Sequence, residues 1–165
     1  MSRAASDRQT ARLRLRRVTL GDVASVVALS TDPRTHRHSP SGTPTPAEAE
    51  GYVRRFAGDW DTFGIGYWLV EFEGRDIGLA GVKPSRLGEL ACWNMYYRFA
   101  PDVHGRGLAA EAMREAIAVA RESRPEWPVV VRTRPANEAA ARLALAIGLK
   151  RRADLDSEGL ITFAG

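Results

Sequence analysis

A chain of 165 residues with 44% apolar and 27% charged side chains can build one domain with a sizeable core. Its net charge of +4 at pH 7 permits anionic ligands, but nucleic-acid binding would need the basic side chains gathered on one face, so we expect no nucleic-acid partner. The single cysteine, Cys92, excludes an internal disulfide and suits a reducing cytoplasm. No apolar run reaches the ~20 residues of a membrane helix, so we expect a cytoplasmic protein without a membrane contact.

The first part of the chain predicts an arm, a strand, two helices and two further strands. Residues 1–11 are polar and basic and are expected to form a flexible N-terminal arm, followed by a single domain over residues 12–165. The expected elements are a strand over 13–18, a helix from Asp22 to about Leu29, a helix from Thr45 to about Trp60, and strands over 66–72 and 76–82. The second helix has the clearest start, because Thr45 is an N-cap, Pro46 suits the first helical position and Glu48 completes a capping box.

The rest of the chain alternates predicted strands and helices. They are a strand over 90–99, a helix over 108–121, a strand over 128–134, a helix over 137–147, and strands over 149–155 and 160–163. Gly148 is expected to end the last helix in the left-handed conformation. This order of elements predicts a mixed α/β domain built on one sheet.

The segment from Phe99 to Met113 predicts a strand end, a glycine turn and the first turns of a helix. Gly105 and Gly107 have no β-carbons, so the backbone of the turn can approach a ligand closely. The free N–H groups and the positive dipole end of the following helix then favour a phosphate or pyrophosphate. The run from Gly105 to Ala110 also satisfies the dinucleotide fingerprint G-x-G-x-x-A. A nucleotide-binding module therefore stays open, although the motif follows three antiparallel-looking strands instead of opening a βαβ sheet.

A second motif lies about thirty residues beyond the glycine turn. The run from Asn137 to Leu149 matches Asn-x-x-Ser/Ala with a later Gly-Phe, and the run from His104 to Ala109 matches Gln/Arg-x-x-Gly-x-Gly/Ala with histidine in the first place. These motifs, each after a predicted strand, resemble the signatures of the GNAT superfamily of acyl-CoA-dependent N-acetyltransferases. The resemblance covers roughly residues 13–163 and is closest to the branch of the ribosomal-protein alanine N-acetyltransferases.

The resemblance implies a mixed, mostly antiparallel sheet of about six to seven strands flanked by about four helices, with splayed fourth and fifth strands. Acetyl-CoA would be the co-substrate, with its pantetheine arm along the open edge of the fourth strand, its thioester carbonyl at the N–H of Phe99, and no metal. The residues expected to bind it are Tyr97, Phe99, Ala100, Pro101, His104, Gly105, Arg106, Gly107, Leu108, Ala109, Asn137 and Arg142. Arg106 and Arg142 are the candidates for its 3′-phosphate.

The resemblance also implies direct attack of a neutral primary amine on the thioester, with Asn94, Tyr96 and Asn137 as candidate catalytic residues. Ala144 stands where many relatives have a tyrosine acid, and Asn94 stands near their acid on the fourth strand, where an amide cannot act as a base. Other carboxylates that could act if the strands curve inward are Glu71, Glu73 and Glu89. An α-amino group, with a pKa near ~8, is partly neutral at pH 7, so a site without a strong base suits it better than a lysine amine.

The acceptor pocket is expected at the loop over 31–45 and the helix that follows it, together with three aromatic side chains of the sheet: Trp68, Trp93 and Tyr96. The basic side chains of that loop, which could contact an acidic acceptor or solvent, are Arg34, His36 and His38. Two histidines without further ligands make a weak metal site, so no metal is expected there. The expected acceptor is a small-molecule or peptide amine, and a homodimer, common among relatives, stays open. A non-catalytic acyl-CoA-binding regulatory module remains the alternative function.

Overall fold

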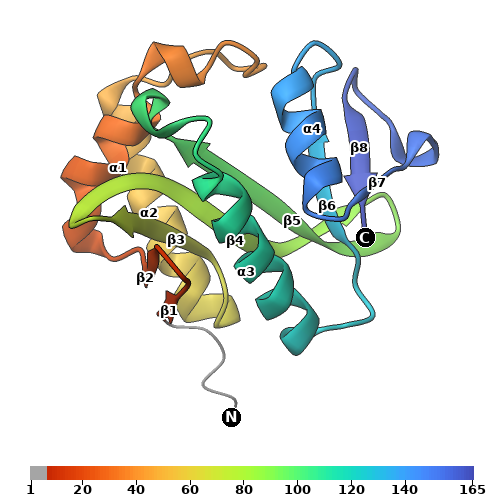
Figure 1. The fold of residues 1–165 in the computed structure, drawn as a ribbon, viewed down its shortest axis with the longest axis horizontal. Helices are drawn as coiled ribbons and strands as arrows, with labels where there is room; N and C mark the ends of the chain where they lie inside the picture. The colour runs from red at the N-terminus through yellow and green to blue at the C-terminus, as the bar shows by residue number, and fades with distance from the viewer. Residues whose placement is uncertain (1–6) are drawn as a thin grey trace.

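One mixed sheet runs through the molecule (Figure 1). The computed structural model describes residues 7–165, and within them eight strands lie in the order β1-β2-β3-β4-β5-β6-β8-β7. The strands are β1 (Arg8–Gln9), β2 (Arg14–Arg17), β3 (Tyr67–Phe72), β4 (Arg75–Leu87), β5 (Leu90–Phe99), β6 (Val129–Thr133), β7 (Lys150–Arg151) and β8 (Ile161–Ala164). All neighbouring strands are antiparallel except β5 and β6.

Four α-helices of the described chain cover the sheet, with α1 and α2 on one face and α3 and α4 on the other (Figure 1). They are α1 (Val23–Ser30), α2 (Pro46–Phe63), α3 (Leu108–Ser123) and α4 (Glu138–Ala146). Short 3-10 turns lie at Leu20–Asp22, Pro33–Thr35, Pro101–Val103 and Ala153–Leu155. The predicted mixed, mostly antiparallel sheet with four helices is therefore confirmed.

The strand count is higher than predicted because of β1. Arg8 and Gln9 pair antiparallel with Leu15 and Arg14, in a stretch expected to belong to a flexible arm over residues 1–11. Residues 1–6 of that arm lie outside the described residues. Arg8 forms ion pairs with Glu115 (3.5 Å) and Glu122 (2.6 Å) of α3. A strand of two residues is too short to show a periodic pattern, and its ion-pair partners on α3 lie far along the chain, so the sequence could not indicate it.

Three other elements differ in length from the prediction. Helix α2 continues to Phe63, where Gly64 ends it with a φ of +68°, because a left-handed residue is the usual stop signal. Strand β4 runs on to Leu87, since β5 pairs with it along the whole hairpin. The strand expected over 149–155 is reduced to the two residues of β7, after which side chains bond locally and turn the chain: Arg151 with Asp156, and Arg152 with Asp154.

The sheet opens between β5 and β6, the fourth and fifth of the predicted strands, and this confirms the expected splay. Their parallel pairing is limited to Trp93 with Val129 and Asn94 with Val130. The N–H of Trp93 donates across this pair to Pro128 (2.9 Å), whereas the N–H of Ala100 donates to the opposite side, to Ile77 of β4 (2.8 Å). Because the direction alternates along a strand, the N–H groups at 95, 97 and 99 point into the opening.

The two faces of the sheet bury separate clusters. On the α1–α2 side, Tyr67 and Leu69 pack with Phe56 of α2. On the α3–α4 side, Trp68 and Val70 belong to the larger core that includes Met113 of α3. Alternation along the strands therefore decides which side chains can meet a ligand from either side.

Candidate functional site

The glycine turn lies between the end of β5 and the start of α3. Gly105 and Gly107 have φ angles of +79° and +74°, which side-chain-bearing residues rarely adopt. Gly107 is the N-cap of α3, no side chain caps the helix, and its carbonyl accepts from the N–H of Glu111 (3.1 Å). The N–H groups of Leu108 and Ala109 therefore have no partner within the helix, and a free helix N-terminus of this kind favours an anion.

Arg12 lies against this turn, a placement that the sequence did not reveal. Its Nη1 donates to the carbonyl of Arg106 (3.0 Å) and its Nε to Glu111 Oε2 (2.7 Å). Burial alone would raise the pKa of Glu111, but hydrogen bonds from Thr10 and Arg12 hold that pKa below its ordinary value. The guanidinium of Arg106 lies 4.8 Å from the ring centroid of Phe72. The turn thus has two arginines and one carboxylate beside the positive end of a helix.

The end of β5 is fixed by a contact back from the turn. His104 Nε2 lies 3.0 Å from the carbonyl oxygen of Phe99. Gly78 of β4 stands opposite Phe99, and a β-carbon there would lie 2.7 Å from the Phe99 ring, so the ring occupies the space a side chain would take. The backbone of Phe99 is held from both sides, with its N–H directed into the opening between β5 and β6.

A polar and aromatic cluster lies on the α1–α2 side of the same strand. Tyr67 and Tyr96 are both register partners of Gly81, and their rings stack above it at 4.9 Å between centroids. The Nδ2 of Asn94 donates to the Tyr67 hydroxyl (3.2 Å). Burial, the largest cause, raises the pKa of Tyr67 well above its ordinary value, so this hydroxyl stays protonated at neutral pH. Strand β5 thus offers two different surfaces: an open backbone edge toward β6, and polar side chains on the face that α1 and α2 cover.

A family model described as an acetyltransferase (GNAT) domain matches residues 12–150 of this chain. The chain belongs to the GNAT acetyltransferase family. A sequence search of the curated proteins gives no match.

Solved structures share the fold of this GNAT domain at low identity. An acetyltransferase from Agrobacterium tumefaciens is 21% identical, with a TM-score of 0.84 over 100% of this chain and 96% of that one. A ribosomal-protein-S5-alanine acetyltransferase from Vibrio fischeri is 15% identical (TM-score 0.74; 98% and 96% covered). The ribosomal L7/L12 α-N-protein acetyltransferase RimL in complex with coenzyme A is 14% identical (TM-score 0.71; 94% of both chains). At these identities, the similarity shows a shared fold only.

The remaining residues expected to bind the cofactor lie in mixed surroundings. Asn137 caps α4, with its Oδ1 accepting from the N–H of Ala140 (3.2 Å), so its amide nitrogen is left to other partners. Arg142 is exposed on α4 and pairs with Glu138 (3.5 Å). Tyr97 is half-buried, and burial raises its pKa to about 12. The two small residues that follow β5 are half-buried at the start of the turn segment: Ala100 and Pro101.

Two of the three tryptophan and tyrosine side chains predicted for the acceptor pocket are not on that side. Trp68 and Trp93 belong to the core on the α3–α4 face, and only Tyr96 faces α1 and α2. Neighbouring side chains of a strand alternate between faces, so Trp68 lies on the opposite face from Tyr67, and Trp93, three residues from Tyr96, lies on the opposite face of β5 from it. Tyr67 and Asn94 take the positions expected for Trp68 and Trp93.

A carboxylate near the acceptor face was missed by the sequence reading. Asp59 of α2 lies 3.9 Å from Lys83 Nζ, and that ammonium lies 5.6 Å from the ring centroid of Tyr67. The spacing of Tyr52, Phe56 and Asp59 along one helix face could have indicated it. By contrast, Glu89 lies in the turn between β4 and β5, at the far end of the strand from Phe99. The other expected acids are Glu71, paired with Arg14 of β2, and Glu73, in the β3–β4 turn.

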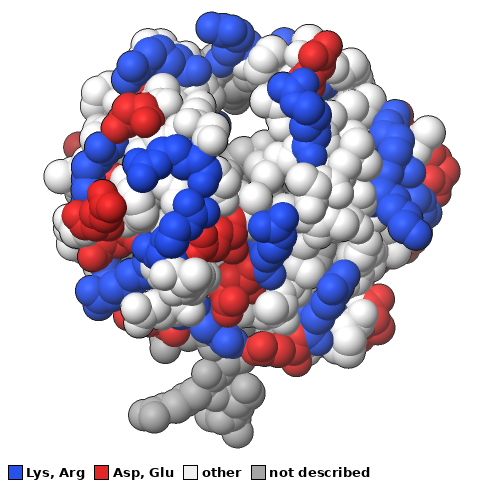
Figure 2. Space-filling model, viewed as in Figure 1, with Lys and Arg blue, Asp and Glu red and all other residues white. Residues whose placement is uncertain are grey.

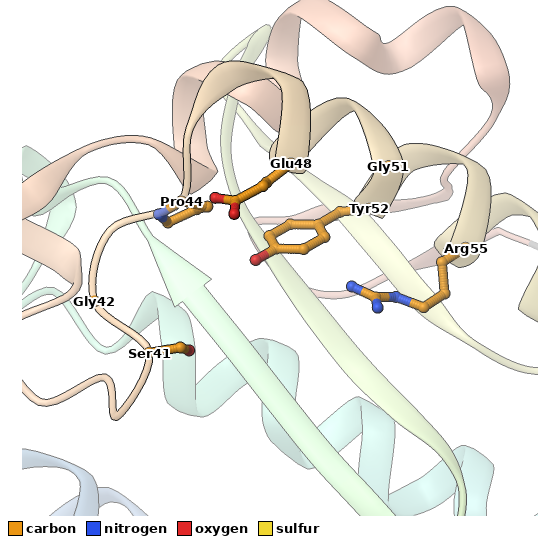
Figure 3. Close-up of a pocket in the computed structure, with 7 residues that line it drawn as sticks. All are labelled: Ser41, Gly42, Pro44, Glu48, Gly51, Tyr52 and Arg55. Atoms are coloured by element: carbon orange, nitrogen blue, oxygen red, sulfur yellow. The ribbon is translucent and has the colours of Figure 1, made fainter.

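A cavity lies between the α1–α2 loop and α2. This cavity of about 360 Å³ is lined by Ser41, Gly42, Pro44, Glu48, Gly51, Tyr52 and Arg55 (Figure 3). The Tyr52 ring and the Arg55 guanidinium reach from α2 toward the same space. The cavity joins the loop and the helix that were predicted to line the acceptor pocket.

The face that carries α3 and α4 has a hollow between α4 and the N-terminal end of α3, and Lys and Arg side chains border this hollow (Figure 2). Over the rest of that face, basic side chains are interspersed with acidic ones. Among residues 7–165, no three His, Cys, Asp or Glu side chains lie together in a way that could hold a metal ion. None of the helices in this range is long and apolar enough to cross a membrane.

His36 makes the α1–α2 loop sensitive to pH. Its Nε2 lies 2.6 Å from the carbonyl oxygen of Ser30, and burial, followed by the charge of Arg98, lowers its pKa below the ordinary 6.5. A lowered pKa means that the stability contributed by neutral His36 is complete above pH 6.5 and is lost as pH falls below it. We expect the Tm to fall between about pH 7.5 and about pH 5.5, and to fall less in His36→Asn. His38→Asn is the control and should keep the wild-type drop; equal drops in both variants would exclude this role for His36.

Proposed function

We propose that this GNAT domain transfers the acetyl group of acetyl-CoA directly to a primary amine. The observation that carries the proposal is the open edge of β5, whose free N–H groups lead into the glycine turn at the start of α3. An extended chain of amides such as pantetheine can pair with this edge as an added strand. The pyrophosphate would then reach the unpartnered N–H groups of the turn, which favour an anion.

Each expected cofactor residue has a role in this arrangement. The N–H groups of Gly105, Gly107, Leu108 and Ala109 would bind the pyrophosphate, and Arg106 or Arg142 the 3′-phosphate. Backbone groups from Tyr97 to Pro101 would pair with the pantetheine amides, and His104 would hold the end of β5 through the carbonyl of Phe99. RimL, which shares the fold, is described in complex with coenzyme A.

The N–H of Phe99 would bind the thioester carbonyl oxygen and stabilise the oxyanion that develops there, by ~3 kcal/mol for such a donor. The amine nitrogen attacks the carbonyl carbon, a C–N bond forms, and the C–S bond breaks. The amine loses a proton and the thiolate takes one, so the products are an amide and free CoA. Asn94 and Tyr96 would position the amine or a water on the acceptor face, and the free amide nitrogen of Asn137 would donate toward the departing sulfur.

The acceptor is a small-molecule amine or the N-terminus of a peptide. The Vibrio fischeri relative is a ribosomal-protein-S5-alanine acetyltransferase and RimL an α-N-protein acetyltransferase by name, which supports a protein N-terminus. An α-amine also needs the least help from a base, since its pKa is near ~8. The proposal includes a cytoplasmic location and no metal, and it allows a homodimer.

One observation favours the alternative of a non-catalytic acyl-CoA-binding module. Ala144 is 1% exposed on α4, at the place where many relatives carry a tyrosine. The test is release of free thiol from acetyl-CoA in the presence of peptide N-termini, polyamines, aminoglycosides and amino acids, with the acetylated product identified by mass. Amine-dependent release supports transfer, whereas a CoA-induced thermal shift with no release for any amine supports the binding module.

Cys92→Ala should retain near-normal turnover, because no acetyl-enzyme is expected. Cys92 is 1% exposed, and burial, the largest cause, raises the pKa of its thiol. It also lies seven residues before Phe99 on β5, which is more than ~20 Å at the rise of a strand. Intact-protein mass after exposure to acetyl-CoA alone checks this. An adduct of about 42 Da that disappears when amine is added would show a covalent route instead.

A further inference from the structure

Arg98 of β5 has donors that the protein leaves unused. Its Nε donates to the Tyr96 hydroxyl (3.0 Å), and its Nη1 donates to the carbonyl of Thr35 (2.5 Å) and to Thr35 Oγ1 (3.1 Å). A guanidinium has five N–H donors, so the two on Nη2 have no partner among the described residues. The side chain lies on the α1–α2 face, next in sequence to Phe99.

The charge of Arg98 is also without a counterion. The side chain is half-buried, yet no carboxylate of residues 7–165 lies within 4.0 Å of it. Asp32, the acid of the neighbouring loop, is bound to Arg34 (2.7 Å) instead. His36 beside it is neutral at pH 7, because burial lowers its pKa. A partly buried cation that has lost water without gaining an anion is costly, which favours a ligand that supplies the negative charge.

Arg55 adds a second cation to the same face. Its guanidinium lies 4.9 Å from the Tyr52 ring and 6.0 Å from the Phe56 ring, and Phe56 lies 6.1 Å from Tyr96. No carboxylate of the described chain lies within 4.0 Å of Arg55 either. Glu48 lines the same cavity, but its carboxylate accepts from the N–H of Thr45 (2.7 Å) as part of the helix cap. Lys83, farther along the same cluster, adds no net positive charge because it is paired with Asp59.

We propose that the acceptor is a primary amine with a carboxylate close to its amino group, and that Arg98 binds this carboxylate. The proposal rests on the proposed acetyl transfer and names the acceptor class. The planar guanidinium matches a carboxylate, and its place beside Phe99 brings the bound amine to the thioester. The carboxylate belongs either to a free amino acid or to an acidic N-terminal residue of a peptide. Arg55 attracts the same anion from the cavity side.

The test compares acceptors that differ in this charge, with kcat/KM expressed per concentration of neutral amine, because a carboxylate beside an amino group also raises the pKa of that amine. The pairs are glycine with glycinamide, and the peptide amides Asp-Ala-Ala with Asn-Ala-Ala; the first pair reports a free amino acid and the second an acidic N-terminus. In at least one pair, wild-type kcat/KM should favour the carboxylate by at least ~10-fold, as expected for hydrogen bonds to a charged group. In Arg98→Gln this preference should fall to about onefold, chiefly through the carboxylate member.

Arg86→Gln is the matched control, because Arg86 is exposed and pairs with Glu89 in the β4–β5 turn (3.6 Å). It should keep the wild-type preference. If Arg98 only holds the loop through Thr35, Arg98→Gln lowers both members of each pair equally, and the proposal is wrong. Equal wild-type use of both members also overturns it while acetyl transfer stands. If no amine is acetylated, calorimetric titration of the CoA-loaded protein with N-acetylglycine and its amide decides, and binding without preference for the carboxylate overturns it.

Discussion

Gly107→Val is expected to abolish acetyl-CoA binding in a protein that remains folded. Gly107 has a φ of +74°, and a β-branched residue there costs about 1–3 kcal/mol of strain or moves the turn out of shape. A turn that moves directs the N–H groups of Leu108 and Ala109 away from the pyrophosphate, and a turn that keeps its shape places the valine side chain where the phosphate would lie. A β-carbon would lie 3.6 Å from Arg12 Nη2, an ordinary contact, so the surroundings have room for it. We expect the Kd to rise by at least ~100-fold in calorimetric titration.

Gly88→Val provides the control for backbone strain. Gly88 has a φ of +55° in the β4–β5 turn, with no atom within 4 Å of a β-carbon. It carries a comparable conformational penalty far from the glycine turn, so it should lower stability without changing the Kd. Equal affinity of wild type and Gly107→Val for acetyl-CoA would show that the turn is not part of the binding site.

Gly81→Ala is expected to have the largest effect on stability among the variants considered. Its methyl group would lie 2.5 Å from the carbonyl oxygen of Gly66 and 2.9 Å from the Cα of Tyr67, which are backbone atoms of the paired strand. Relief requires β3 and β4 to separate, at a cost of about 3 kcal/mol. The Tm should fall by about 6–12 °C in a chain of this length.

The same variant should also lower acetyl transfer, because relief of the clash with the Tyr67 backbone moves Tyr67 relative to Tyr96, its stacking partner. Gly58→Ala on α2 is the control. Nothing lies within 4 Å of its β-carbon, so it should raise stability by about 0.5–1 kcal/mol. A Gly81→Ala protein with wild-type Tm and turnover would show that the strands adjust freely, contrary to this account.

Local signals in the sequence predicted the parts of the fold that depend on neighbouring residues. Thr45 and Glu48 form the capping box, Asn137 caps α4, and Gly148 takes a φ of +95° after it. Each of these depends on hydrogen bonds or backbone angles within a few residues, and the residue types report them directly. The glycine turn belongs to the same class, which is why the family could be recognised from it.

Contacts between distant segments left no such trace. Arg12 reaches Glu111 across 99 positions, and Arg98 reaches Thr35 across 63. The sequence also did not show which face of the sheet Trp68 and Trp93 occupy, so both were expected in the acceptor pocket although they lie on the α3–α4 face. Apolar residues occupy both faces of these central strands, so alternation in the sequence could not decide which face meets α1 and α2.

The most direct test of the central claim is a single assay of acetyl-CoA with wild type and Gly107→Val across a panel of primary amines. Free thiol and acetylated amine are quantified in the same reaction. We expect that wild type produces both in equal amounts, that the rate depends on the amine, and that Gly107→Val produces neither above background. Wild-type protein that binds CoA but acetylates no amine, or a Gly107→Val variant as active as wild type, would contradict it.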